Sequence, residues 1–232
     1  MHSEYLYNND TKEFHNRVQK LALCDEPALR AHCKEVSCLL GTSSLAARGA
    51  YKEKTQHVQA IFQTMAAHLR SLSQTLSSGG ELFGGRDAKA DFVAVCRAVT
   101  ALEGQRVALV GGVAQLSLLR QTLFSRVAEA NSTLQFLRSA RGAVAGEVQV
   151  HYTEAIEAAE VAYEDLKALD IAICEVLEFS MTYVERLMPA FMERLRTAAD
   201  FNHAGAALNR GAVRTLCNEA LIALQRAPNI TF

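Results

Sequence analysis

Apolar side chains that return every seven residues constrain the fold of this chain more than any other feature. Two long stretches, 88–141 and 147–201, each keep one unbroken register of this kind. A seven-residue repeat corresponds to about 3.5 residues per turn, so helices that bury such a seam wind around each other left-handedly. The register of the first stretch comprises Phe92, Val95, Val99, Leu102, Leu109, Val113, Leu116, Leu123, Val127, Leu134 and Leu137. That of the second comprises Val148, Tyr152, Ala155, Ala159, Ala162, Leu166, Leu169, Ile173, Val176, Tyr183, Leu187 and Ala190, with Ser180 in one slot.

A third long helix is expected within 27–78. Its apolar residues alternate in steps of four and three, at Val58, Phe62, Met65, Leu69, Leu72 and Leu76. At about 1.5 Å per residue, a helix of about fifty residues spans roughly 75 Å, whereas a compact domain of this size is about 35–40 Å across. We therefore predict an all-α fold: an elongated antiparallel three-helix coiled-coil bundle with short flanking helices.

Sparse helix-breaking signals set the expected boundaries. The chain has only three prolines and no tryptophan, which favours helix over sheet. Asp25-Glu26-Pro27 is typical of a helix start, because Asp caps the helix and Pro fits its first turn. Glycines near 79–85, at 142–146 and at 205–211 mark the later breaks. The predicted divisions are 1–26, a short amphipathic N-terminal helix; 27–203, the three-helix bundle; and 204–232, a C-terminal helix and tail.

Charge is balanced overall but segregated along the chain. Twenty-four basic residues face twenty-five acidic ones, for a net charge of -1, which argues against a nucleic-acid partner. The stretch 106–141 is basic and the stretch 147–178 is acidic. If the two fold back on each other around 142–146, their charges either neutralise one another across the hairpin or leave a basic edge at its tip. Both interpretations remain open from the sequence.

Pro189 interrupts the third stretch. Proline donates no backbone hydrogen bond and crowds the preceding turn, so it kinks or ends a helix. The expected apolar register continues on both sides of it, through Leu187 and Ala190, which favours a helix kink at Pro189 over a helix that ends at Met188.

No recognised catalytic or ligand-binding motif is present in the sequence. Phosphate-binding, dinucleotide-binding, nucleophile-elbow and zinc-protease motifs are all missing. The six cysteines form no C-x-x-C pair and are expected to be reduced and mostly buried. We expect no enzyme activity, no cofactor and no metal. Without an apolar run of about eighteen residues or a secretory signal, we expect a cytoplasmic protein with no membrane span.

Two stretches resemble the BAR-domain superfamily, over roughly residues 27–201. The segment Ala101-Leu102-Glu103-Gly104-Gln105-Arg106-Val107-Ala108-Leu109, with the apolar group 119–124, is similar to the second helix of that family. The segment from Tyr163-Glu164-Asp165-Leu166 to Leu187-Met188-Pro189-Ala190-Phe191 resembles the third. The resemblance implies three long, kinked antiparallel helices that form a curved homodimer and bind anionic membrane surfaces as a peripheral protein.

The resemblance also implies sites for membrane binding and dimerisation. Membrane contacts are expected at Arg126, Arg138 and Arg141, and at Lys12, Arg17 and Lys20 of the N-terminal helix. That helix either inserts into the bilayer interface or packs on the bundle. The expected dimer interface comprises Val58, Phe62, Met65, Leu69, Leu187 and Phe191.

Two other functions remain open. The first alternative is a helical scaffold or adaptor that binds other proteins through the acidic third helix and makes no lipid contact. Its partners include other coiled-coil proteins. A pore-forming subunit is a third interpretation, for which 107–113 is only a short apolar candidate.

Overall fold

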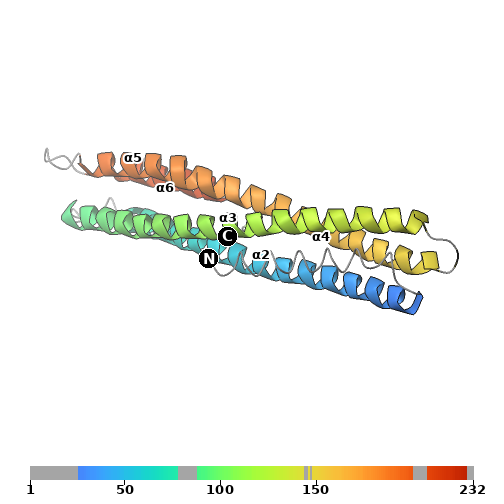
Figure 1. Ribbon diagram of the computed structural model, residues 1–232. Coiled ribbons are helices and arrows are strands. Elements are labelled where there is room, and N and C mark those ends of the chain that lie inside the picture. The colour runs from blue at the N-terminus through green and yellow to red at the C-terminus, as the bar shows by residue number, and fades with distance from the viewer. Residues whose placement is uncertain (1–25, 78–87, 144–145, 147, 201–207, 229–232) are drawn as a thin grey trace. The chain divides into compact units, whose positions relative to one another are not determined.

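The computed structural model describes residues 26–77, 88–143, 146, 148–200 and 208–228 (Figure 1). Within these residues all regular structure is helical and no strand occurs. The helices are α2 (Glu26–Ser77), α3 (Ala88–Ala143), α4 (Val148–Thr182), the π-helical turn η2 (Tyr183–Leu187), α5 (Met188–Asp200) and α6 (Arg210–Leu224). The all-α prediction is confirmed.

The observed helices follow the predicted stretches closely. Helices α2 and α3 contain 52 and 56 residues, and their ends lie within a few residues of the predicted ones. Gly146 lies in the turn before α4 with φ of 75°, a conformation that glycine adopts without steric cost. The C-terminal helix α6 begins after Asn209, whose side-chain Oδ1 accepts a hydrogen bond from the Ala212 amide at 3.0 Å. The helix expected near 11–24 lies outside the described residues.

The chain forms two compact units, and the long helices contribute to both. Among the described residues, unit 1 comprises 26–52 and 118–173, and unit 2 comprises 53–117 and 174–228. Unit 1 is therefore built from parts of α2, α3 and α4. Unit 2 also contains η2, α5 and α6, and α6 packs against α5. The predicted division into 1–26, 27–203 and 204–232 stays a prediction.

The core of unit 1 is the predicted seam. Leu123, Ala130 and Leu137 of α3 have no exposed surface, and α4 contributes a row of small or medium side chains to the same core. Each fully buried leucine contributes about 1.5–3 kcal/mol relative to its exposed state, so burial of the seam stabilises this unit. The buried residues of α4 in this unit are Tyr152, Ala155, Ile156, Ala159, Ala162, Leu166 and Ile173.

The core of unit 2 includes a cluster of three aromatic rings. Phe62 of α2 meets Phe179 and Tyr183 edge-to-face, with ring centroids 5.5 and 5.4 Å apart, and Phe179 stacks on Tyr183. Burial raises the pKa of the Tyr183 hydroxyl well above its usual value. The tyrosine therefore stays neutral and serves as a packing residue. Helix α6 adds Val213, Leu216, Cys217, Ala220 and Leu224 to the buried residues of the unit.

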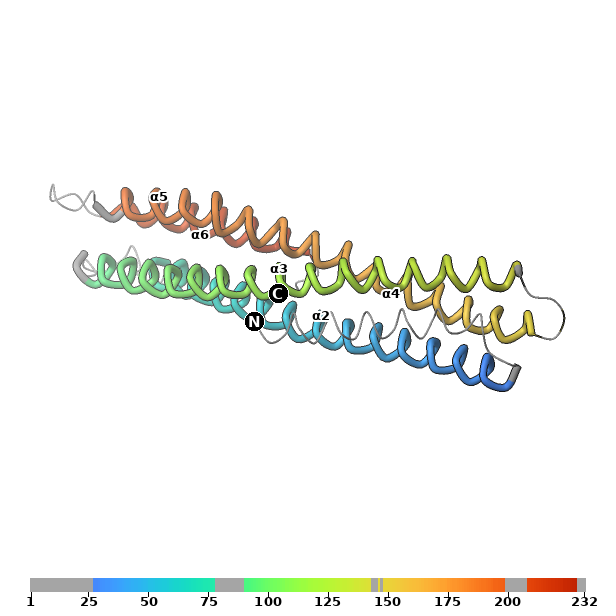
Figure 2. The backbone as a smooth tube through the Cα atoms, in the orientation of Figure 1, coloured from blue at the N-terminus to red at the C-terminus, as the bar shows by residue number. Residues whose placement is uncertain are grey.

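The helix through Pro189 is continuous, but its register shifts by one residue. The tube in Figure 2 runs from α4 into α5 without a break. In η2 the Met188 amide donates to the Tyr183 carbonyl, five residues back, so the turn holds one extra residue. Leu187, the last residue of this turn, is 42% exposed, whereas the next residue, Met188, is 1% exposed.

This shift corrects the register that the sequence predicted around Pro189. Leu187 and Ala190 were expected in the seam, but Met188, Phe191 and Leu195 take the buried positions. The helix does not end at Met188, since α5 begins at that residue directly after η2. A π turn just before Pro189 relieves the crowding that the proline ring imposes on the turn before it. The bend itself stays a prediction.

Candidate functional site

The arginines expected to bind membranes are largely engaged within unit 1. Arg138 of α3 donates through Nη2 to Oε1 of Glu160 on α4 at 2.7 Å. Arg126 donates through Nη1 to the Ser43 carbonyl of α2 at 3.0 Å. Arg141 is exposed in the last turn of α3. Lys12, Arg17 and Lys20 lie outside the described residues.

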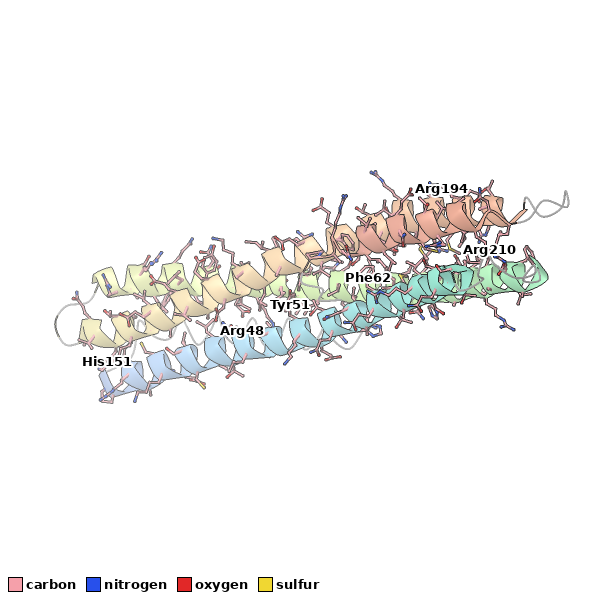
Figure 3. The ribbon with its side chains drawn as sticks, turned by 180° about the vertical axis from the view of Figure 1, so that it is seen from behind. Arg48, Tyr51, Phe62, His151, Arg194 and Arg210 are labelled. Carbon is pink, nitrogen blue, oxygen red and sulfur yellow. The ribbon has the colours of Figure 1, made fainter. Side chains whose placement is uncertain are left out.

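Further ion pairs join the same helices. Arg120 of α3 lies 3.6 Å from Asp170 of α4, and Arg48 of α2 pairs with Asp165 of α4, which also accepts from the Ser44 hydroxyl. Figure 3 labels Arg48 on α2. Of the two interpretations that the sequence left open, the Arg120–Asp170 and Arg138–Glu160 pairs support neutralisation across the hairpin, while Arg141 leaves one basic side chain exposed at its tip. Exposed pairs of this kind contribute only about 0–1 kcal/mol each, so they fix the alignment of the helices more than they stabilise them.

The residues expected at a dimer interface lie in the core of a single chain. Val58, Phe62 and Met65 have no exposed surface, and Leu69 and Phe191 are 1% and 8% exposed. A side chain without exposed surface contacts a second copy only if the core opens. These five side chains are covered by their own chain in this structure, and their assignment to a dimer interface stays a prediction. Of the predicted set, Leu187 is the one that the structure places on the surface.

The acidic side chains of α4 point to solvent. Glu154, Glu157 and Glu164 of unit 1 are exposed, as are Glu175 and Glu178 of unit 2. The single lysine of this helix, Lys167, lies 3.8 Å from Glu164 and 5.7 Å above the Tyr163 ring. Because Arg126 and Arg138 of α3 are engaged and Glu154 and Glu157 of α4 are exposed, this part of α4 presents an acidic face.

A shallow groove of about 500 Å³ lies between α2 and α4 in unit 1. Small side chains form its floor, and the exposed side chains of Leu45 and Val161 line it. Glu154 and Glu157 stand at its edge. The lining comprises Ser37, Gly41, Ser44, Leu45, Arg48, Glu154, Glu157, Ala158, Val161, Ala162 and Asp165. Sequence analysis missed this groove, although an exposed leucine one turn after a helical glycine is a signal for it.

Helix α3 also carries exposed apolar residues. Val107 and Val110 in unit 2 are 62% and 47% exposed. By length and composition α3 passes as a membrane-spanning candidate: its most apolar window of eighteen residues has a mean hydropathy of 1.3, and 22% of that window is buried. The run of apolar residues sought in the sequence is absent because glycines and polar residues are interspersed, but the average over the window is still apolar.

The described residues contain no cluster of three or more metal-ligating side chains. Burial raises the pKa of the Cys217 thiol to about 11, and burial together with the charge of Glu154 raises that of Cys33 to about 11. These two thiols stay protonated near neutral pH and behave as small apolar residues. Cys38 and Cys96 are exposed, contrary to the expectation that most cysteines are buried.

No known protein family and no curated protein matches the chain. The resemblance to BAR domains thus rests on the residues quoted for it in the sequence. The function has to be argued from the surface of the two units.

Proposed function

We propose that this protein is a non-enzymatic helical scaffold that binds basic segments of other proteins through the exposed acidic face of α4. The observation that supports the proposal is which of the segregated charges pair with each other in the folded chain and which remain exposed. Arg120, Arg126 and Arg138 of α3 are engaged by α2 and α4, while other carboxylates of α4 remain in solvent, at Glu154, Glu157, Glu175 and Glu178.

An acidic helical surface favours a basic partner. Opposite charges across an interface speed association and discriminate against partners of the wrong charge. Carboxylates that already pair within the chain, such as Asp165 and Glu160, are less available than Glu154 and Glu157. The expected interaction is salt-dependent, because exposed charges are screened over about 8–10 Å at physiological ionic strength.

Membrane association by a BAR-like homodimer is the second candidate. Two observations favour it: Arg141 is exposed at the end of α3, and the apolar side chains of Val107 and Val110 face outward on the same helix. In this view the three antiparallel helices of unit 1 form a BAR-like arm, and a peripheral membrane location follows.

One pair of binding assays separates the two candidates. The purified chain is mixed with vesicles of phosphatidylcholine and phosphatidylserine at low salt, and separately with a fluorescent peptide rich in lysine. The scaffold proposal predicts peptide binding that weakens with added salt, and no pelleting with vesicles. Pelleting without peptide binding would refute it.

Charge reversal tests the membrane candidate directly. If the end of α3 contacts lipid, Arg141→Glu reduces pelleting, whereas Arg97→Glu, at an exposed site near the start of the same helix, does not. Equal effects of both variants contradict a specific role for Arg141. Light scattering gives the mass of the particle in solution, and a mass of a single chain contradicts the homodimer.

A further inference from the structure

We propose that the groove between α2 and α4 of unit 1 is a docking site for one amphipathic helix of a partner protein, with apolar residues on one face and lysine or arginine beside them. This inference rests on the proposed function. It specifies where on the acidic surface the partner binds and which kind of helix the partner presents.

The floor of the groove allows a helix to come close. It is formed by small side chains from both helices, Ser37 and Gly41 of α2 and Ala158 and Ala162 of α4. A Cβ atom added at Gly41 would meet nothing within 4 Å. The glycine is therefore not required by packing within the chain. It leaves open space in which a side chain of the partner fits.

The walls of the groove offer apolar contact from each side. Leu45 of α2 is 69% exposed and Val161 of α4 is 64% exposed, and both line the groove. Removing apolar surface from water favours binding, so these two side chains provide a small apolar anchor. A helix contacts such an anchor through apolar residues spaced three or four positions apart, as in other helix-in-groove complexes.

The charges at the groove edge specify the sign of the partner. Glu154 and Glu157 lie one turn apart on α4 and are both exposed. The other two charged residues of the lining, Arg48 and Asp165, pair with each other. The groove therefore has uncompensated negative charge beside its apolar walls. A partner with lysine or arginine flanking its apolar face complements both features.

The probe for this proposal is a fluorescent synthetic helix of about eighteen residues, with leucine on one face and lysine flanking it. Binding to the full chain is followed by fluorescence anisotropy. Gly41→Phe fills the groove, and Gly104→Phe places the same residue at an exposed helical glycine of unit 2 that also has open space around it. We expect Gly41→Phe to weaken binding at least tenfold and Gly104→Phe less than twofold, with unchanged helicity in both variants.

A second pair of variants tests the charges. The double variant Glu154→Gln/Glu157→Gln removes the groove carboxylates, and Glu175→Gln/Glu178→Gln removes two exposed carboxylates of α4 outside the groove. At about 0.5 kcal/mol for each exposed charge pair, the first is expected to weaken binding about fivefold and the second less than twofold.

The outcomes separate the groove from the proposed function. If both pairs of carboxylate variants weaken peptide binding equally and Gly41→Phe does not weaken it, the proposal of an acidic scaffold is retained and the proposal of a docking groove is refuted. Absence of any peptide binding overturns both. A doubled mass in light scattering that Gly41→Phe halves shows that a second copy of the chain occupies the groove, which also overturns the proposal of a partner helix.

Discussion

Two adjacent glycines of α3 provide a sharp test of the packing in unit 2. Gly111 is exposed, and a Cβ atom added there would meet nothing within 4 Å. Gly112 is buried, and a Cβ atom there would lie 3.0 Å from Cγ2 of Val58 on α2. Replacing either glycine by alanine removes the same helix-propensity cost, about 1 kcal/mol. The two variants therefore differ only in what the new methyl group meets.

The neighbour of Gly112 has little freedom to move. Val58 has no exposed surface, and a β-branched side chain in a helix keeps one strongly preferred rotamer. The contact is relieved only if α2 and α3 separate slightly. Overpacking of this kind costs about 1–3 kcal/mol. We expect Gly111→Ala to raise the free energy of unfolding by about 1 kcal/mol, and Gly112→Ala to leave it unchanged or lower it by up to about 2 kcal/mol.

Urea unfolding followed by circular dichroism at 222 nm measures both values. With a urea dependence of about 1–3 kcal/mol per molar, the expected difference of about 2 kcal/mol separates the midpoints by roughly 1 M. Val58→Ala in the Gly112→Ala background is expected to show a favourable coupling of about 1 kcal/mol, because it removes the clashing methyl group. Equal stabilisation by the two glycine variants would refute the close approach of α2 and α3 at this position.

Three further predictions address the register, a buried ion pair and the thiols. Met188→Ser is expected to lower the free energy of unfolding by about 2–4 kcal/mol and Leu187→Ser by less than about 1 kcal/mol; the opposite order in urea unfolding contradicts the register shift at η2. Asp91→Ala leaves its α6 arginine partner unpaired, and because that arginine is partly exposed the expected loss is about 2 kcal/mol, measured the same way; no loss contradicts the α3–α6 contact. At pH 8, Cys38 is expected to react with a disulfide reagent within seconds and Cys33 only on unfolding, since burial raises the pKa of the Cys33 thiol to about 11. Folding favours the protonated form of the Cys33 thiol. The stability that this thiol contributes is therefore present below pH 9 and lost as the pH rises from 9 to 11. Equal reaction rates of single-cysteine variants contradict the burial.

The sequence predicted the helices because their pattern is local. Seven-residue spacing places apolar side chains on one stripe of a helix whatever the stripe meets, and the ends of α2 and α3 lie close to the proline and glycine signals that mark helix boundaries. The pairing of α3 arginines with α4 carboxylates was one of two interpretations open from the sequence, since a short connection near Gly146 lets the two helices run antiparallel. Arg138 and Glu160 show this pairing directly.

The sequence was ambiguous where one chain pattern admits two tertiary outcomes. An apolar stripe such as that of Val58 and Phe62 is covered either by helices of its own chain or by a second copy, and its spacing is the same in both cases. The residues on either side of Pro189 offered two apolar rows, one through Leu187 and one through Met188. The extra residue of the π turn selects the second, and nothing in the spacing of the apolar residues records it.

The sequence alone thus determined which residues are helical and which face of each helix is apolar, because both depend on neighbours a few positions away. The tertiary structure alone decided which stripe meets which, where the register slips at η2, and that Gly41, Leu45 and Val161 face a common groove. Those features depend on the relative placement of side chains far apart in the chain, which the periodicity of one helix does not encode.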